Sequence, residues 1–186
     1  MSILDIRVLG DPILREETKP VEQITDELRT LVKHMFETMY LAKGIGLAAP
    51  QVGRTERVAV VDVENNPIVL INPEIVESDS KTAQAEEGCL SIPDVYGDVE
   101  RPGRVRVRAL NLEGNPFEME AGDLLGRCFQ HEIDHLHGKL FVDYMSVLKR
   151  RSAMAKWTKE KDKYPGFIRK LENDPSLEHE HPDEEL

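Results

Sequence analysis

Apolar residues recur at the three- and four-residue spacing of a helix in two parts of the chain. The first part follows Thr25 and ends near Ala42, with apolar residues at Leu28, Leu31, Val32, Met35, Phe36 and Met39. This spacing places them on one face and predicts an N-terminal helix packed on a core, with Thr25 as its N-cap. The second part, from about Gly122 to Gly138, carries Leu125, Phe129, Ile133 and Leu136. A C-terminal helix is expected from Ser146 to about Lys163.

Between these helices the pattern is that of strands. We predict strands at residues 57–63 and 68–71, the second ended by Asn72-Pro73. Val105, Val107 and Ala109 alternate with arginines, and the turn at residues 113–115 predicts a return strand at 117–120. Helices and strands do not alternate strictly. The expected class is therefore α+β, with mostly antiparallel sheets packed around a central helix.

Composition sets limits on this picture. The 186 residues suit a single domain, which we expect to comprise residues 1–165. A polar, acidic tail follows at 166–186, and its end, from residue 173, is expected to be disordered. A net charge of −11 argues against DNA binding by the chain as a whole. No apolar run approaches 18 residues and no signal-peptide pattern is present, so we expect a cytoplasmic protein without membrane association.

The central helix carries the strongest chemical signal. His131, Glu132 and His135 form a His-Glu-x-x-His run. Residues four apart share a helix face, so the two imidazoles can hold one metal ion, with Glu132 beside it to handle protons. The alternative is a solvated helix with chance histidines. The apolar residues around the run favour a buried helix, where unpaired imidazoles are costly.

A catalytic metal needs a third protein ligand, and Cys89 is the strongest candidate. His34 lies on another predicted helix, and His137 lies on the wrong face; His179 and His181 fall in the acidic tail. The alternative for Cys89 is a small buried hydrophobe. The other cysteine, Cys128, is interpreted as pocket lining, and a disulfide between the two is not expected in a reducing compartment.

Three segments resemble one family in sequence, order and spacing. They are residues 44–51 (Gly-Ile-Gly-Leu-Ala-Ala-Pro-Gln), 87–91 (Glu-Gly-Cys-Leu-Ser) and 130–135 (Gln-His-Glu-Ile-Asp-His). Over roughly residues 3 to 150 the chain resembles the peptide deformylases. The resemblance implies a hydrolase that removes the formyl group from N-terminal formylmethionine of newly synthesised polypeptides. It also implies one divalent metal held by Cys89, His131 and His135, with Fe(II) as the usual physiological metal and zinc, nickel or cobalt as possible substitutes.

The resemblance also implies roles for individual residues. Water activated by the metal attacks the formyl carbon, with Glu132 as general base and then acid. The Gln51 side chain and the Leu90 backbone N–H meet the charge that develops on the formyl oxygen. The backbone at Ile45 and Gly46 pairs with the substrate as an added strand. The methionine side chain enters an apolar pocket lined by Ile45, Leu124, Cys128 and His131.

Two positions depart from several bacterial members. Ala85 and Arg127 stand where those members have larger aliphatic residues, so we expect Arg127 at the substrate pocket and a wider or more polar pocket mouth. The resemblance further implies a salt bridge between Glu87 and Arg101 that braces the Cys89 loop. Two unpaired surface charges are the alternative.

A basic cluster in the C-terminal helix raises the question of partners. Its members are Lys149, Arg150, Arg151, Lys156, Lys159, Lys161 and Lys163. A ribosome contact through rRNA phosphates is one interpretation, and a solvated helix face is the other. We expect a monomer. Two other functions stay open at this point, a zincin-type metallopeptidase and an inactive relative that only binds peptides or the ribosome.

Overall fold

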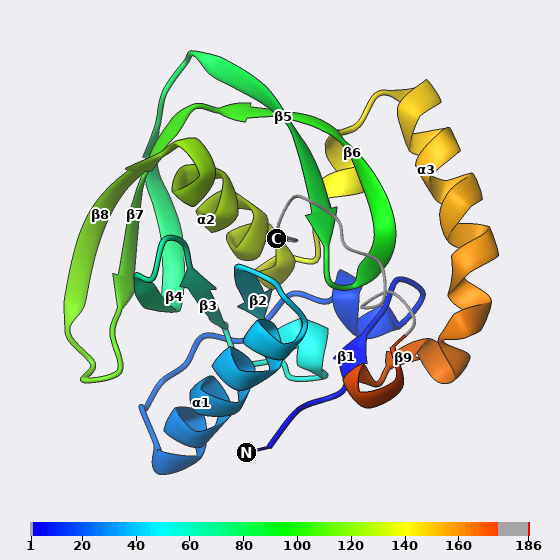
Figure 1. Cartoon of the computed structure of the whole chain (residues 1–186). Coiled ribbons are helices and arrows are strands. Elements are labelled where there is room, and N and C mark those ends of the chain that lie inside the picture. Colours follow the sequence, from blue (N-terminus) through cyan, green and yellow to red (C-terminus); the bar gives the residue numbers. More distant parts are fainter. Residues whose placement is uncertain (1, 175–185) are drawn as a thin grey trace.

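The structure is a computed structural model that describes residues 2–174 and Leu186. Three α-helices accompany the sheets: α1 (Asp26–Leu41), α2 (Asp123–Leu136) and α3 (Val147–Glu160). Helix α2 lies in the middle of the fold, with α1 below it and α3 along the outer side (Figure 1). The predicted α+β class is confirmed.

Helix caps follow the sequence signals closely. The Thr25 hydroxyl accepts a hydrogen bond from the Leu28 N–H at 3.1 Å and begins α1. Ser146 does the same for α3 by accepting from Lys149 N–H. Gly138, just beyond α2, has a left-handed φ of 72°, where a side chain would also meet the backbone of Arg15. The three predicted helices are therefore present, because their capping chemistry is local.

A five-stranded antiparallel sheet forms one side of the molecule. Its strand order is β2–β3–β4–β7–β8, with bounds Gly46–Ala48, Val58–Asp62, Pro67–Ser78, Arg104–Leu110 and Pro116–Gly122. The β7–β8 hairpin is the one that the alternating pattern predicts. The short strand β2 lies at one edge of this sheet, and helix α2 packs across strands β2, β3, β7 and β8.

Strand β4 differs from its prediction. It does not end at Asn72-Pro73 but continues to Ser78, with a register shift against β7 between Ile71 and Glu74. Asn72 adopts a left-handed φ of 50°, and its amide exchanges two hydrogen bonds of 2.8 Å with the backbone of Val21. The Asn-Pro pair therefore marks a bulge inside a strand.

Two further sheets were not predicted. Strands β5 (Thr82–Cys89) and β6 (Ile92–Pro102) form a hairpin on the opposite side of α2 from the large sheet (Figure 1). Residues 82–86 of β5 are exposed and carry no large apolar side chain, so no alternating apolar pattern announces the strand. Strands β1 (Ile6–Arg7) and β9 (Ile168–Arg169) pair over two residues only.

The chain beyond residue 165 contributes to the fold. Strand β9 pairs with β1, and the Arg169 side chain is buried, where it contacts Asp174 and donates to the Leu90 carbonyl at 2.8 Å. The predicted disorder at residues 173–186 falls almost wholly on 175–185, which lie outside the described residues. The division at residue 165 thus stays a prediction, with β9 placed beyond it.

Among the described residues, no helix is both long and apolar enough to cross a lipid bilayer.

Candidate metal centre and active site

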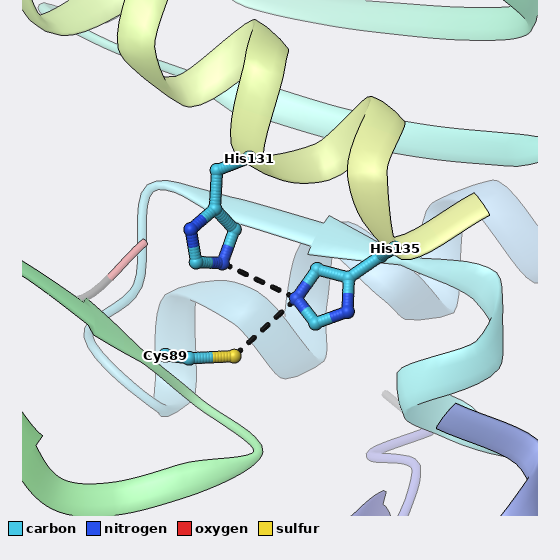
Figure 2. Close-up of side chains that lie close together, drawn as sticks. All are labelled: Cys89, His131 and His135. Atoms are coloured by element: carbon cyan, nitrogen blue, oxygen red, sulfur yellow. Dashed lines mark hydrogen bonds between the residues drawn. The ribbon is translucent and has the colours of Figure 1, made fainter. Parts of the chain in front are cut away.

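Three buried side chains from two elements converge between α2 and the β5–β6 hairpin. His131 and His135 project from neighbouring turns of α2, and Cys89 ends β5 (Figure 2). The His135 Nε2 atom lies 3.2 Å from His131 Nε2 and 3.3 Å from Cys89 Sγ. All three ligand atoms lie within 4.8 Å of one another, and each residue is at most 2% exposed.

This cluster fits a divalent transition metal. Ligand atoms bonded to one tetrahedral Zn²⁺ or similar ion at about 2.0–2.3 Å lie roughly 3.3–3.8 Å apart, close to the spacings between His135 and its two neighbours. Burial lowers the pKa of His135 well below its usual range, with the neighbouring His131 as the next cause. His135 is thus the neutral imidazole that binds metals. A thiolate with two imidazoles is a donor set for iron or zinc.

Glu87 supports the cluster from the hairpin. One of its carboxylate oxygens lies 3.0 Å from His131 Nδ1, and Arg101 donates to both oxygens at 2.6 and 2.9 Å. An imidazole whose Nδ1–H is held by a carboxylate presents its Nε2 lone pair to a metal. The predicted Glu87–Arg101 salt bridge is confirmed, and Arg101 extends it to Asp134 on α2 at 2.9 Å.

Arg127 is a second cation on Glu87. Its guanidinium donates to Glu87 at 2.7 Å and to the backbone carbonyls of Val99 and Ala83, both at 2.9 Å. Burial raises the pKa of the Glu87 carboxyl, but hydrogen bonds from His131 and Arg101 outweigh it and hold that pKa well below its usual range. Glu87 is therefore an anion that ties α2 to both strands of the hairpin.

The environment of Glu132 is the opposite of that of Glu87. It is fully buried, yet within the described part of the chain neither of its carboxylate oxygens has a hydrogen-bond partner. Burial raises its pKa well above the usual range, with the nearby charge of Glu87 as the next cause. Gly46 on β2 makes room for it, since a Cβ there would lie 2.5 Å from Glu132 Oε1. A buried carboxylate left without partners is costly unless something binds there.

Gln51 and Leu90 lie next to the thiolate ligand. Gln51 follows β2 and is fully buried, with its amide nitrogen 3.6 Å from Cys89 Sγ and donating to the Ser91 hydroxyl at 3.1 Å. Its amide oxygen accepts from the Ala48 N–H at 2.9 Å, which fixes the orientation of the amide. The Leu90 N–H follows Cys89 directly and donates to the Leu186 carbonyl oxygen at 3.3 Å. Two donors therefore lie beside the metal cluster.

The structure brings together some of the predicted substrate-binding residues but not all. Ile45, Gly46 and Cys128 lie together, with the Cys128 thiol 3.7 Å from the Ile45 carbonyl. Burial raises the pKa of Cys128 well above its usual range, so it stays a neutral thiol. Leu124 lies in the first turn of α2 and is 45% exposed.

Arg127 has partners that the sequence did not predict. Its guanidinium donates to Glu87 and to two backbone carbonyls of the hairpin, and its expected place at the substrate pocket stays a prediction. Ala85, on β5, lies opposite Val99 and is exposed. The Arg127 guanidinium thus forms a clamp between α2 and the β5–β6 hairpin.

Comparison with known proteins settles the family. The sequence profile described as polypeptide deformylase matches residues 3–151. The chain belongs to the peptide deformylase family. It is 55% identical over 163 residues to the peptide deformylase of Alkalilimnicola ehrlichii, covering 86% of this chain and 91% of that protein. It is 52% identical over 159 residues to that of Acinetobacter baumannii, covering 84% and 90%.

Solved deformylase structures agree with the fold. A peptide deformylase from Legionella pneumophila shares 48% identity and a TM-score of 0.83, covering 87% of this chain and 96% of that one. A peptide deformylase from Synechococcus elongatus in complex with actinonin shares 48% identity and a TM-score of 0.80, covering 82% and 86%. This deformylase is a metal-dependent hydrolase that removes the N-formyl group from nascent peptides. The zincin-type metallopeptidase is not supported.

Sequence reasoning missed two features of this deformylase site. The hairpin that carries Cys89 and Glu87 was not predicted, and neither was the contact between Glu87 and His131. An available signal was Arg127 itself. An arginine inside an otherwise apolar helix face requires a buried anion, and Glu87 was already expected to pair with a cation.

Proposed function

We propose the following division of work among the residues of the site. Cys89, His131 and His135 would hold one divalent metal, which would acidify a water near neutral pH and polarise the formyl oxygen. Glu132 accepts the proton of that water and passes it to the leaving amine. The observation that carries this proposal is the Glu132 carboxylate, which is buried beside the cluster with no partner of its own.

Gln51 and the Leu90 N–H stabilise the charge that develops on the formyl oxygen. Both donors lie beside Cys89, and the Gln51 amide is held in place by Ala48. Preorganised donors of this kind need no reorientation during the reaction. Each is expected to contribute about 2.7–4 kcal/mol of transition-state stabilisation.

The substrate peptide adds to the edge of β2 that pairs with no other described strand. Strand β2 is an edge strand of the large sheet, and Gly46 brings its backbone against Glu132. An unpaired strand edge binds an extended peptide through main-chain hydrogen bonds, which suits an enzyme that meets many sequences. The methionine side chain then enters the apolar space by Ile45 and Cys128, with Leu124 at its rim.

Fe(II) is the metal proposed for the cell, with zinc, nickel or cobalt as substitutes, and the enzyme is proposed to be a cytoplasmic monomer. The test is anaerobic purification with metal analysis, followed by assays on formyl-Met-Ala-Ser and on casein as a control. We expect release of formate, no casein cleavage, and activity that falls on exposure to air as Fe(II) and its thiolate ligand oxidise. Full activity with a metal-free protein would contradict the proposed centre.

Ribosome contact through α3 is a separate proposal. The helix buries Ala153 and Trp157 and exposes its cations. Lys149 and Arg150 pair with Asp98 and Asp143, whereas Arg151, Lys156 and Lys159 make no ion pair with any described residue. Free cations on one helix suit rRNA phosphates.

Co-sedimentation with ribosomes tests this contact. Reversing the charge of Arg151, Lys156 and Lys159 to Glu is expected to abolish pelleting in low salt. Reversing three exposed cations elsewhere, Arg29, Lys33 and Lys43, is the matched control and is expected to preserve it. Equal pelleting of both triple variants would show that α3 is a solvated face only.

A further inference from the structure

We propose that Tyr144 is a positioning residue of the metal centre, because its ring covers the Arg101 guanidinium and keeps the ion pairs behind it in one arrangement. Tyr144 ends the short 3-10 helix η3 (Phe141–Tyr144), which follows α2. The centre of its ring lies 4.8 Å from the guanidinium carbon of Arg101. This inference rests on the proposed metal site, since Arg101 acts on the ligand His131 through Glu87.

The Arg101 guanidinium has its edges occupied and its face left for an aromatic ring. Its Nε atom and one terminal nitrogen donate to Glu87 at 2.6 and 2.9 Å, and the other terminal nitrogen donates to Asp134 at 2.9 Å. These donors lie in the guanidinium plane, and the face of that plane is weakly hydrated. An aromatic ring attracts a cation placed over it. Tyr144 therefore completes the surroundings of a cation whose hydrogen bonds are already made.

The ring of Tyr144 lies at the surface, and the ion pairs lie beneath it. Tyr144 is 43% exposed, whereas Arg101 is 4% exposed and Glu87 is 1% exposed. Water and dissolved salt weaken the attraction between opposite charges that they can reach. An exposed ring over a buried guanidinium therefore keeps the attraction between Arg101 and Glu87 strong.

The hydroxyl of Tyr144 holds the ring in this place. It forms a hydrogen bond with Asp134, the same carboxylate that accepts from Arg101. Burial raises the pKa of Tyr144 to about 12, with the charge of Asp134 as the next cause, so the hydroxyl stays protonated and donates. Tyr144, Arg101 and Asp134 therefore form one connected set that joins η3 to α2.

The other end of η3 contacts a metal ligand directly. Phe141 is 1% exposed and stacks on the His131 ring, with 6.2 Å between the ring centres and 21° between the planes. Between the two aromatic residues, Asp143 pairs with Arg15 at 2.6 Å, which fixes the turn to the N-terminal part of the chain. Helix η3 therefore supports the centre at both of its ends. Without the Tyr144 ring, metal binding has to restore an arrangement that the metal-free protein no longer keeps.

Metal affinity, measured by competition with a chelator, tests this role without turnover. Tyr144→Leu removes the ring and is expected to weaken metal binding about twofold to fivefold, the factor that corresponds to a cation–π contact near the surface. Tyr144→Phe keeps the ring and should recover most of that loss. Tyr40→Leu is the matched control, because Tyr40 is also exposed and its hydroxyl also contacts an aspartate, Asp62. A loss as large in Tyr40→Leu, or none in Tyr144→Leu, would overturn the proposal.

Salt and a double variant show whether the ring acts through the ion pairs. Raising KCl from about 0.05 to about 1 M should weaken metal binding by Tyr144→Leu further relative to the parent, because exposed charge pairs are screened more than buried ones. In a Glu87→Gln background, Tyr144→Leu should have no further effect on metal affinity. An equal effect of Tyr144→Leu in both backgrounds would contradict a role exerted through Glu87.

The same assay on Cys89→Ala distinguishes failure of this inference from failure of the proposed metal site. Full metal affinity in Cys89→Ala would overturn the site and with it the role of Tyr144. Loss of the metal in Cys89→Ala, together with the parent affinity in Tyr144→Leu, would leave the site in place and overturn the role of Tyr144 alone.

Discussion

The two sides of helix α2 each carry a buried glutamate, and their surroundings differ completely. On the hairpin side, Glu87 accepts hydrogen bonds from Arg101 and Arg127 and contacts His131, and its pKa is lowered. On the β2 side, Glu132 has no partner for either oxygen among the described residues, and its pKa is raised. Burial is the same in both places, so burial alone does not distinguish them.

The difference lies in what each carboxylate is free to do. Glu87 has satisfied its hydrogen-bonding capacity with the protein and holds a ligand imidazole in place. In the proposed mechanism, Glu132 keeps its hydrogen-bonding capacity for groups that come and go during the reaction. A buried acid without partners costs stability, and proteins tolerate that cost at functional sites. Under that proposal, satisfaction of hydrogen bonds separates the supporting glutamate, Glu87, from the reacting one, Glu132.

Loss of a metal ligand is expected to have the largest effect. Cys89→Ala removes the thiolate, so the purified protein should retain little metal and lose nearly all deformylase activity. Cys128→Ala is the matched control, because that thiol is not a ligand, and it should keep the metal. Metal analysis of both proteins checks this. Full metal content in Cys89→Ala would remove Cys89 from the centre.

Loss of the Gln51 amide donor is expected to have the second largest effect. Gln51→Leu keeps the side-chain volume and removes the N–H group beside Cys89. We expect kcat to fall about 10²–10³-fold, with metal content near that of the parent. A fall in metal content as large as the fall in kcat would instead make Gln51 a structural support of the Cys89 loop.

Of the two cations that contact Glu87, Arg101 should matter more for metal affinity than Arg127. Arg101→Met removes a bidentate pair and should weaken metal affinity about 100-fold, and Arg127→Met should weaken it about tenfold. Competition with a chelator measures both. Arg127→Lys should restore part of the affinity, since one ammonium can still reach Glu87. An affinity in Arg127→Met equal to that of the parent would show that the clamp between α2 and the hairpin has no role in metal binding.

The smallest expected effect is on the unfolding free energy of the metal-free protein. The folded pKa of Glu132 is raised above its unfolded value, near 4.5, so its contribution to stability is present below that pH and is lost as pH rises through the folded pKa. The metal-free Glu132→Gln variant has no carboxyl at this position, so it does not undergo this loss of stability. From pH 4.5 to pH 8 the difference in unfolding free energy should move in favour of the variant. Urea unfolding in chelator measures it, and a difference that stays constant with pH would contradict the assigned environment.

Much of this site could be predicted from sequence, for local reasons. The i, i+4 histidines and the helix caps are short-range features, and the resemblance of three segments supplied Cys89 and Gln51. The β5–β6 hairpin could not be predicted, because the exposed residues of β5 carry no apolar pattern. The partners of Arg127 could not be predicted either, because they include Glu87, forty residues earlier and on another element. The burial of Leu186 likewise depends on contacts far along the chain.

The most direct test exchanges the two glutamates for glutamine and measures metal content and turnover together. Glu132→Gln is expected to retain its metal and lose about 10²–10⁴-fold in kcat, because only the proton-transfer group is removed. Glu87→Gln is expected to lose about 10–100-fold in metal affinity and to recover most of its turnover when metal is added in excess. A Glu132→Gln enzyme that deformylates formyl-Met-Ala-Ser near the parent rate would contradict the account.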